Sequence, residues 1–413
     1  MPPVFLVCHS TRPRGGLVHT LSLGEALLDL GVDARLVAIG DPSAGLFRPT
    51  PLPHTIVPSP PPGESLEERV FAAVDALEAA LNLRCPPGPV VLHAQDCIAA
   101  RAACRIRDGH ALTGPRPGST SVVRTVHHVD DFTTPALIEC QRRAILDPDR
   151  VLVVSEHWRT LLAEDYGVDA AVVRNGVDPD RFGQGGPGER ERFRARAGGD
   201  ETFLILTVGG IEPRKGSITL LEAMAELAAR TNGAGPRPVL AIVGGHTFFD
   251  YRAYRDSALA RLPELGLVEG RDIFLLGTVS EADLGAWYRA ADAFAFPSVK
   301  EGFGLVVLEA LAAGLPVVAS DIPVFAEYLR DGENALLVAP GDAAALAGAL
   351  HRLAGDPALR KTLATGGQPL IERFTWAASA LTHRNVYSAA SEGPAVGSPP
   401  GARGCPPEWS HEH

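Results

Sequence analysis

The chain has 413 residues, of which 46% are hydrophobic and 21% charged, and its formal net charge is −11. This length allows two or three domains with cores of their own, and the acidic balance argues against broad nucleic-acid binding, which needs clustered Lys and Arg. The start has no signal-peptide pattern, no run of about 18 apolar residues occurs, and the six cysteines form no C-x-x-C pair, so we expect a cytoplasmic protein without a zinc site or disulfide scaffold.

The N-terminal residues have the pattern of a doubly wound α/β domain. An apolar strand, Val4 to Cys8, leads through a loop ending in Gly15-Gly16 into a helix from about Val18 to Leu30, and a second strand covers Ala34 to Ile39. This order is typical of a parallel sheet with helices on its faces. The loop lacks the G-x-G-x-x-G pattern, which argues against a dinucleotide-dependent oxidoreductase. A proline-rich stretch, 49–62, follows.

Two further strands of this domain end in histidines. Val90 to Leu92 is followed by His93-Ala-Gln-Asp96, and Ser121 to Val126 is followed by His127 and His128. Ligands of open parallel sheets bind at the carboxyl ends of the strands. An imidazole at such a place can hydrogen-bond a hydroxyl group in either charge state. The doubled histidine leaves open which of the two rings faces a ligand.

The pattern restarts in the second half of the chain. A strand from Val151 to Ser155 and the turn Asn175-Gly-Val-Asp178 close the first unit, and a Gly-rich linker covers 183–188. A strand from Phe203 to Val208, a loop and a helix to about Arg230 then repeat the opening order. The chain therefore contains two domains of one style.

The loop that follows the strand at Phe203 carries two cations. It reads Gly209-Gly-Ile-Glu-Pro-Arg-Lys-Gly216, which places Arg214 and Lys215 above the carboxyl end of the strand in an otherwise acidic chain. Cationic donors at this position can offset the charge that builds on a phosphate leaving group.

The most informative stretch is Pro297 to Ala313, which reads PSVKEGFGLVVLEALAA. It follows a short apolar strand and predicts a tight loop and a helix that begins near Leu305. The first N–H groups of such a helix suit an anion, phosphate above all. The carboxylates of Glu301 and Glu309 can accept hydrogen bonds from hydroxyl groups. A ligand with a phosphate and several hydroxyls, such as a sugar nucleotide, fits both features.

Glu301-Gly-Phe-Gly followed by Glu309 resembles the E-x7-E signature of the retaining glycosyltransferases of family 4, the glycosyl transferases group 1. His93-x-x-Asp96, Thr125-x-His127 and the Asn175 turn are similar to motifs that the family has in the same order, and the resemblance extends to about residue 390. It implies an α/β protein of the GT-B fold, with two doubly wound Rossmann-like domains facing each other across a cleft.

The resemblance also implies boundaries. Residues 1–182 would form the acceptor-side domain, completed by a C-terminal helix at about 375–391, and residues 183–374 would form the nucleotide-sugar domain. Residues 392–413 are rich in Gly, Pro and Ser, so we expect a disordered tail.

The family's activity is the transfer of a sugar from a nucleotide-sugar donor to an acceptor hydroxyl with retention of the anomeric configuration. By this resemblance no metal or cofactor is needed. His127 and Glu301 would face the donor sugar, Lys215 the diphosphate and Glu309 the ribose, and Val279 would present backbone groups to the base. Transferred to this chain, the catalytic residues are His127, Glu301 and Lys215. The donor-binding residues are Gly16, Arg214, Lys215, Val279, Phe303, Gly304, Leu305 and Glu309.

One departure concerns Gly210, which stands where the family often has an arginine, and whether Arg214 replaces it stays open. A sugar-nucleotide epimerase or a phosphorylase of the same fold, and a non-catalytic nucleotide-sugar or carbohydrate-binding protein, are the alternatives. The base, the donor sugar and the acceptor, which could be a sugar, a small molecule or a lipid, are not readable. Binding to the inner face of a membrane also stays open, with a modest basic patch. The patch consists of Arg101, Arg105 and Arg107.

Overall fold

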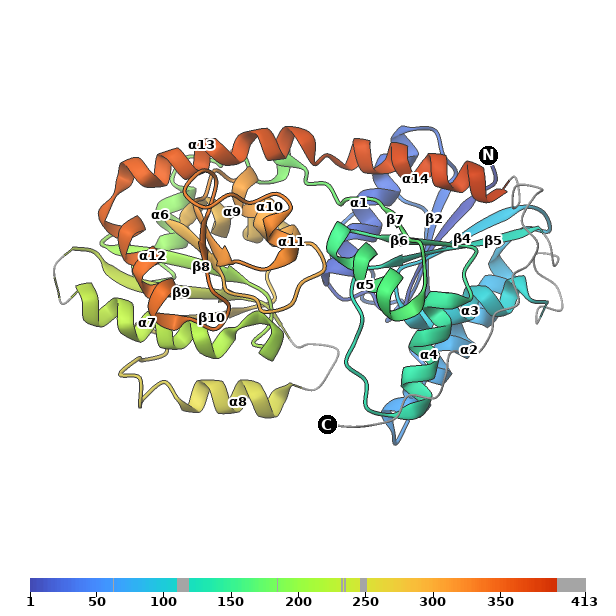
Figure 1. The fold of residues 1–413 in the computed structure, drawn as a ribbon, viewed down its shortest axis with the longest axis horizontal. Helices are drawn as coiled ribbons and strands as arrows, with labels where there is room; N and C mark the ends of the chain where they lie inside the picture. Colours follow the sequence, from blue (N-terminus) through green and yellow to red (C-terminus); the bar gives the residue numbers. More distant parts are fainter. Residues whose placement is uncertain are drawn as a thin grey trace.

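The computed structural model describes residues 1–61, 63–109, 119–183, 185–231, 233, 235–245 and 251–391. In this part of the chain two parallel β-sheets lie next to each other, each with helices on both faces (Figure 1). The two predicted doubly wound units are therefore present. The tail expected at 392–413 lies outside the described residues.

The first sheet has seven parallel strands in the order β3-β2-β1-β4-β5-β6-β7. They are β1 (Val4–Cys8), β2 (Ala34–Gly40), β3 (His54–Pro58), β4 (Val90–Ala94), β5 (Thr120–Val126), β6 (Arg150–Val153) and β7 (Ala171–Val172). Every residue of β1 and β4 is buried, because helices cover both faces of the central strands. The strand order reverses between β1 and β4, which makes their carboxyl ends the switch point where ligands bind in such sheets.

Helices cover the two faces of this sheet. They are α1 (Gly15–Asp29), α2 (Leu66–Arg84), α3 (Cys97–Arg107), α4 (Pro135–Leu146) and α5 (Glu156–Tyr166). One hydrophobic cluster joins α2, α3 and α4 to the sheet, and another joins α1 to the opposite face. A short 3₁₀ helix, η1 (Pro179–Arg181), follows β7.

The second sheet has six parallel strands in the order β10-β9-β8-β11-β12-β13. They are β8 (Thr202–Val208), β9 (Arg237–Val243), β10 (Ile273–Gly277), β11 (Ala293–Phe296), β12 (Val317–Ser320) and β13 (Leu336–Val338). Its helical elements are α6 (Glu189–Arg194), η2 (Pro213–Lys215), α7 (Ser217–Thr231), α8 (Arg252–Ala260), α9 (Glu281–Ala290), α10 (Leu305–Ala312), α11 (Pro323–Ala326), α12 (Ala343–Gly355) and α13 (Pro357–Arg373). Here the switch point lies between β8 and β11.

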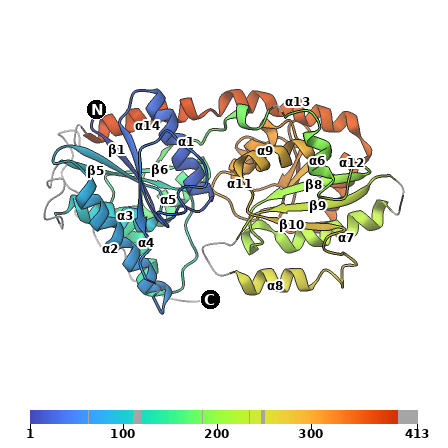
Figure 2. The same ribbon diagram turned by 180° about the vertical axis from the view of Figure 1, so that it is seen from behind.

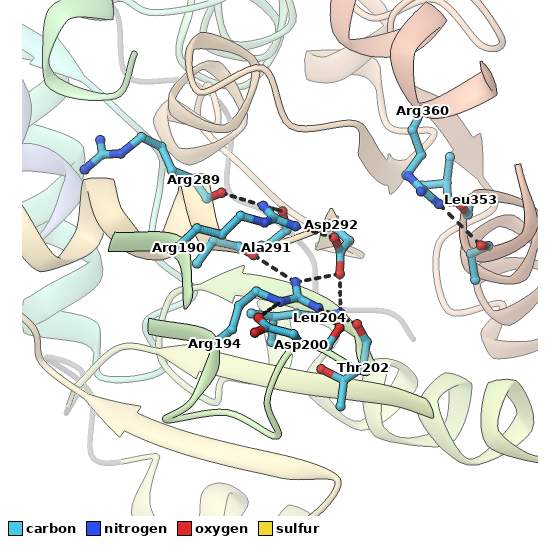
Figure 3. A network of polar contacts seen from close by, with 12 residues as sticks. Arg190, Arg194, Asp200, Thr202, Leu204, Arg289, Ala291, Asp292, Leu353 and Arg360 are labelled. Atoms are coloured by element: carbon cyan, nitrogen blue, oxygen red, sulfur yellow. Dashed lines mark hydrogen bonds and ion pairs between the residues drawn. The ribbon is translucent and has the colours of Figure 1, made fainter. Parts of the chain in front are cut away.

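An ionic network fixes α6 to the amino ends of β8 and β11, at the edge of the sheet away from the switch point (Figure 3). Arg194 is only 4% exposed, and its guanidinium donates to a carboxylate oxygen of Asp292 at 2.9 Å. The other donor to this oxygen is the backbone N–H of Leu204, at 2.8 Å, and Arg190 donates to the second carboxylate oxygen at 2.7 Å. The buried cation is thus fully paired, as burial of a charge requires.

The last described helix, α14 (Trp376–Ser391), leaves the second unit and packs on the first (Figures 1 and 2). The Tyr387 hydroxyl and His93 Nδ1 share a hydrogen bond of 2.7 Å, and Ser121 donates to the carbonyl of Ala390 at 2.8 Å. The N–H of Val177 donates to the carbonyl of Phe374 at 2.9 Å. The two segments in which the chain passes between the units, one after β7 and one before α14, therefore lie side by side. These contacts tie the two units together.

Several local expectations need correction. The first helix begins at Gly15 rather than Val18, because the two glycines adopt helical geometry in its first turn. The proline-rich stretch contains β3, an edge strand, where Pro58 needs no hydrogen-bond donor. The residues of the basic patch lie on α3 and are neutralised by carboxylates at 2.6 to 3.1 Å, namely those of Asp147, Asp75, Glu78, Asp108 and Asp149. Within the described ranges no helix is long and apolar enough to cross a bilayer.

Candidate functional site

A cleft of about 810 Å³ lies between the two sheets and is lined by the loops that follow β1, β4, β5, β8 and β11. These are the carboxyl ends of the strands at both switch points. The volume lies in the range of roughly 300–1,000 Å³ typical of sites for small molecules. All residues that the sequence predicted as catalytic or donor-binding line this one cleft.

Glu301 and the two predicted cations meet on the wall formed by the second sheet. The Nζ of Lys215 donates to Oε1 of Glu301, and Arg214 approaches the same oxygen at 3.2 Å. The loops that carry these residues are joined by a hydrogen bond of 2.8 Å from the N–H of Val299 to the carbonyl of Arg214. The ammonium of Lys215 also lies 4.4 Å from the centre of the Phe296 ring. Arg214 and Lys215 therefore converge on one oxygen of Glu301.

This cluster is charged although it is buried. Burial alone would raise the pKa of Glu301, but Lys215 and Arg214 more than offset this and hold it below its usual value. Burial lowers the pKa of Lys215, and the neighbouring Glu301 opposes that change. The side chains of Glu301 and Lys215 are 8% and 15% exposed, so an incoming anion or hydroxyl would meet them with little competing water.

The helix α10 directs its N-terminus at the cleft, as the sequence predicted. Gly304 precedes it with φ of +86°, and a Cβ atom there would lie 2.5 Å from the ring of Phe325, so only glycine fits this position. Phe303 turns its ring into the core, where Tyr328 packs on it and donates to its carbonyl at 2.6 Å. Phe303 can therefore serve a ligand through its backbone. Leu305 opens the helix at the rim of the cleft.

Glu309 lies in the second turn of α10 and is 9% exposed. Its Oε2 accepts a hydrogen bond of 2.8 Å from the hydroxyl of Tyr288. Burial raises the pKa of Glu309 to about 7, with a further contribution from Glu281, whereas Tyr288 acts in the opposite direction. The carboxyl group thus stands at the edge of ionisation near neutral pH and can accept further hydrogen bonds from hydroxyl groups.

The wall of the first sheet touches this loop directly. A Cβ atom on Gly302 would lie 2.2 Å from the carbonyl oxygen of His127, so the close approach requires glycine. The indole Nε1 of Trp158 donates to the carbonyl of Glu301 at 3.0 Å, and Lys300 pairs with Asp131 at 2.9 Å. The loop between β11 and α10 is therefore held from both sides of the cleft.

Of the two neighbouring histidines, His127 is the more buried and His128 is exposed, pairing with Asp130 at 3.2 Å. The Nε2 of His127 bonds the amide oxygen of Gln95 at 3.0 Å. Burial, together with His19 and Arg124, lowers the pKa of His127 well below its usual value, so this ring is neutral. Both histidines line the cleft.

Other predicted positions lie on its rim. Gly16 is in the first turn of α1, with open space where a side chain would be. Val279 follows β10, beside the start of α9. His93, by contrast, is fully buried beneath α14 and bonded to Tyr387 and Thr125, so its role is structural. In the described part of the chain no group of three or more His, Cys, Asp or Glu side chains is suited to a metal ion.

Sequence reasoning missed Gln95, Arg124, Trp158 and Tyr288. Gln95 lies within the His93 motif, and Arg124 directly precedes the Thr125 motif, so both could have been found as polar residues at strand ends. Trp158 and Tyr288 lie on helices far from any motif, and only the tertiary contacts reveal them.

Two family models match the chain: Glycosyltransferase Family 4 over residues 13–181 and Glycosyl transferases group 1 over residues 189–368. A D-inositol 3-phosphate glycosyltransferase of Streptomyces bingchenggensis is 35% identical over 255 residues, which are 59% of this chain. That match spans about half of the relative's length, 54%. A phosphatidyl-myo-inositol mannosyltransferase of Mycobacterium leprae is 30% identical over 390 residues and covers 91% of this chain and 93% of the relative.

Solved structures have the same architecture. Sucrose-phosphate synthase from Thermosynechococcus elongatus has a TM-score of 0.74 at 24% identity, covering 94% of this chain and 99% of the other. The Anabaena protein HepE in complex with UDP-glucose has a TM-score of 0.76 at 19% identity, covering 94% and 100%. At these identities the likeness concerns the fold, and it confirms the predicted GT-B arrangement.

Proposed function

The chain belongs to glycosyltransferase family 4, within the glycosyl transferases group 1, and from this premise we propose that it transfers a sugar from a nucleotide-sugar donor to an acceptor hydroxyl. The transfer retains the anomeric configuration and needs no metal ion. The observation that carries the proposal is the convergence of Lys215, Glu301, Glu309 and the N-terminus of α10 on one cleft. In this proposal Lys215 and the N-terminus of α10 bind the diphosphate, Glu301 binds the sugar and Glu309 binds the ribose.

The donor diphosphate binds at the N-terminus of α10 and at Lys215 and Arg214. Helix N-termini and cations both stabilise phosphate oxygens. Glu301 turns to the sugar hydroxyls, and Glu212 stays paired with Arg214 at 2.9 Å. Glu309 accepts hydrogen bonds from the ribose. The related Anabaena protein HepE has been solved in complex with UDP and glucose and in complex with UDP-glucose, which supports a nucleotide sugar as the donor class.

In the reaction, the bond between the anomeric carbon and the diphosphate breaks, and the acceptor oxygen attacks from the same face. The proton of the acceptor hydroxyl passes to a phosphate oxygen of the leaving diphosphate. Lys215 and Arg214 stabilise the negative charge that develops there. Glu301 and His127 orient the donor sugar, and the contact between Gly302 and His127 excludes water that would hydrolyse it.

The acceptor site lies on the wall of the first sheet. The names of the relatives contain D-inositol 3-phosphate and phosphatidyl-myo-inositol, which share an inositol ring with a phosphate. A phosphorylated polyol is therefore the first acceptor class to try.

The test begins with thermal unfolding of the protein in the presence of UDP-, GDP- and ADP-sugars, first with a chelator and then with magnesium. A ligand at 100 times its dissociation constant stabilises by roughly 2.7 kcal/mol. We expect one nucleotide to stabilise the protein without metal, and its sugar to be transferred to an acceptor with the anomeric configuration preserved in the NMR spectrum.

The alternatives give different outcomes. Binding without consumption would indicate a non-catalytic binding protein, and conversion of the donor sugar without an acceptor would indicate an epimerase. A product of inverted configuration, or an absolute need for magnesium, would overturn the retaining, metal-independent mechanism.

A further inference from the structure

Three arginines of the described chain are at least nine-tenths buried, and one of them differs from the others. Arg48 and Arg194 are 6% and 4% exposed, and each pairs with carboxylates: Arg48 with Glu25 at 2.8 Å and Arg194 with Asp292 at 2.9 Å (Figure 3). Arg124 is 6% exposed and has no ion pair with any described carboxylate. Buried charges are normally paired because their desolvation is costly.

The guanidinium of Arg124 is only half satisfied. Its Nη1 donates to the backbone carbonyls of Thr125 and, at 3.4 Å, of Ala94. The Nε is buried and has no hydrogen-bond partner. The Nε and Nη2 edge is thus left without a protein acceptor among the described residues. That edge presents two parallel N–H groups, the fork that binds a phosphate or carboxylate in a bidentate way.

Arg124 belongs to the cleft and stands apart from the donor cations. It lies near the carboxyl end of β5, three residues before His127, on the wall of the first sheet, whereas Lys215 and Arg214 stand on the opposite wall. One continuous cleft therefore has cationic side chains on both of its walls. The volume of about 810 Å³ lies toward the upper end of the range of roughly 300–1,000 Å³ found for small-molecule sites.

The carboxylates near Arg124 have partners of their own. Asp96 accepts from the N–H groups of His9 and Ala99, each at 2.8 Å, and Asp130 pairs with His128 at 3.2 Å. Burial lowers the pKa of Arg124, and these carboxylates oppose that change from a distance. The Asp96 and Asp130 carboxylates therefore reduce the positive electrostatic potential around Arg124 without accepting a hydrogen bond from its Nε and Nη2 edge.

We propose that Arg124 binds an anionic group of the acceptor, a phosphate, at its free Nε and Nη2 edge. This inference rests on the proposed function, since it assigns the acceptor's phosphate to the first-sheet wall while the donor's diphosphate binds the second. The acceptor is then a phosphorylated polyol, either free in solution or as the headgroup of a lipid.

The first experiment compares Arg124→Met with Arg194→Met in the absence of ligand. Arg194 is a paired structural cation, so its loss should lower the melting temperature strongly. Loss of the unpaired Arg124 should leave the melting temperature unchanged or raise it, because a buried charge without a counter-charge disappears. A fall as large as that of Arg194→Met would assign Arg124 a structural role and overturn the proposal.

The second experiment measures binding by calorimetry with UDP present, using inorganic phosphate, D-myo-inositol 3-phosphate and unphosphorylated myo-inositol as probes. We expect the phosphorylated inositol to bind more tightly than myo-inositol, and Arg124→Met to weaken it by roughly ten- to a hundredfold, the value of a charge-assisted hydrogen bond. The control Arg12→Gln removes an exposed positive charge from the rim of the same cleft and should change the affinity less than about twofold. Equal affinity of the native protein and Arg124→Met for the phosphorylated probe would refute the proposal.

A third arm separates the two sources of the phosphate. Co-sedimentation with phosphatidylcholine vesicles, with and without phosphatidylinositol, reports a lipid headgroup, and the soluble probes report a free phosphate; binding to either that depends on Arg124 supports the proposal. The affinity for UDP and the slow hydrolysis of the donor sugar are measured in every variant. If no nucleotide binds the native protein, the proposed function fails. If nucleotides bind but the phosphorylated probes bind the native protein and Arg124→Met with equal affinity, only this inference fails.

Discussion

Replacing Glu309 with Gln should remove a pH-dependent loss of stability from the native protein. Burial raises the pKa of this carboxyl group from 4.5 to about 7. Each unit of difference between folded and unfolded states corresponds to about 1.36 kcal/mol, so the shift represents about 3 kcal/mol. The protonated form is the one that the fold prefers. The stability from this group is therefore fully present below about pH 4.5 and is lost as the pH rises through about 7.

The assay is thermal unfolding of the native protein and Glu309→Gln from about pH 5 to about pH 8. Because Gln does not titrate, the melting temperature of the variant should rise relative to that of the native protein as the pH increases over this range. About 3 kcal/mol corresponds to a relative shift of roughly 6 to 12 °C for a unit of this size. Glu281→Gln is a second variant for comparison, because Glu281 raises the pKa of Glu309. Its loss should lower the pKa of Glu309 and so shorten the pH range over which the native protein loses stability.

The same group connects stability to ligand binding. If ribose hydroxyls donate to Glu309, nucleotide binding favours the ionised carboxylate. The affinity for UDP should then rise between about pH 6 and about pH 8 and be accompanied by proton release, which calorimetry in two buffers detects. Parallel pH profiles of the native protein and Glu309→Gln would show that the group titrates normally, and a pH-independent UDP affinity would remove it from the ribose site.

Three further predictions concern the chemistry of the cleft. Lys215→Ala should abolish transfer and, because Glu301 keeps only Arg214 as a counter-charge, cost about 3 kcal/mol in unfolding measurements; near-normal turnover would exclude Lys215 from the mechanism. Gly302→Ala places a methyl group against the carbonyl of His127 and should lower transfer while UDP still binds, and a crystal structure with unchanged loop positions would contradict this. Gln95→Leu releases the ring of His127 and should lower kcat more than donor affinity, with Gln95→Glu as the polar control; an unchanged kcat would show that the hydrogen bond does not position His127.

Much of the fold was predictable because it depends on local patterns. Apolar runs such as Val4–Cys8 and Thr202–Val208 are buried parallel strands, and the glycines before Leu305 predicted the start of α10. The predicted site residues line one cleft for the same reason, since each follows a strand of a parallel sheet. Several helices were missed, including α3, α5 and α9, because their apolar positions become meaningful only against a partner surface.

The sequence by itself determined the two doubly wound units, the family and the set of groups offered to a ligand, because strand and helix periodicity and short motifs are local properties. Only the tertiary structure decided how those groups meet. Residues 86 positions apart pair in the Lys215–Glu301 contact, and the approach of His127 to Gly302 crosses between the two sheets. Whether a buried arginine finds a carboxylate is likewise a property of the packed molecule. Among the described residues, the packing pairs Arg194 with Asp292 and leaves the Nε of Arg124 without an acceptor.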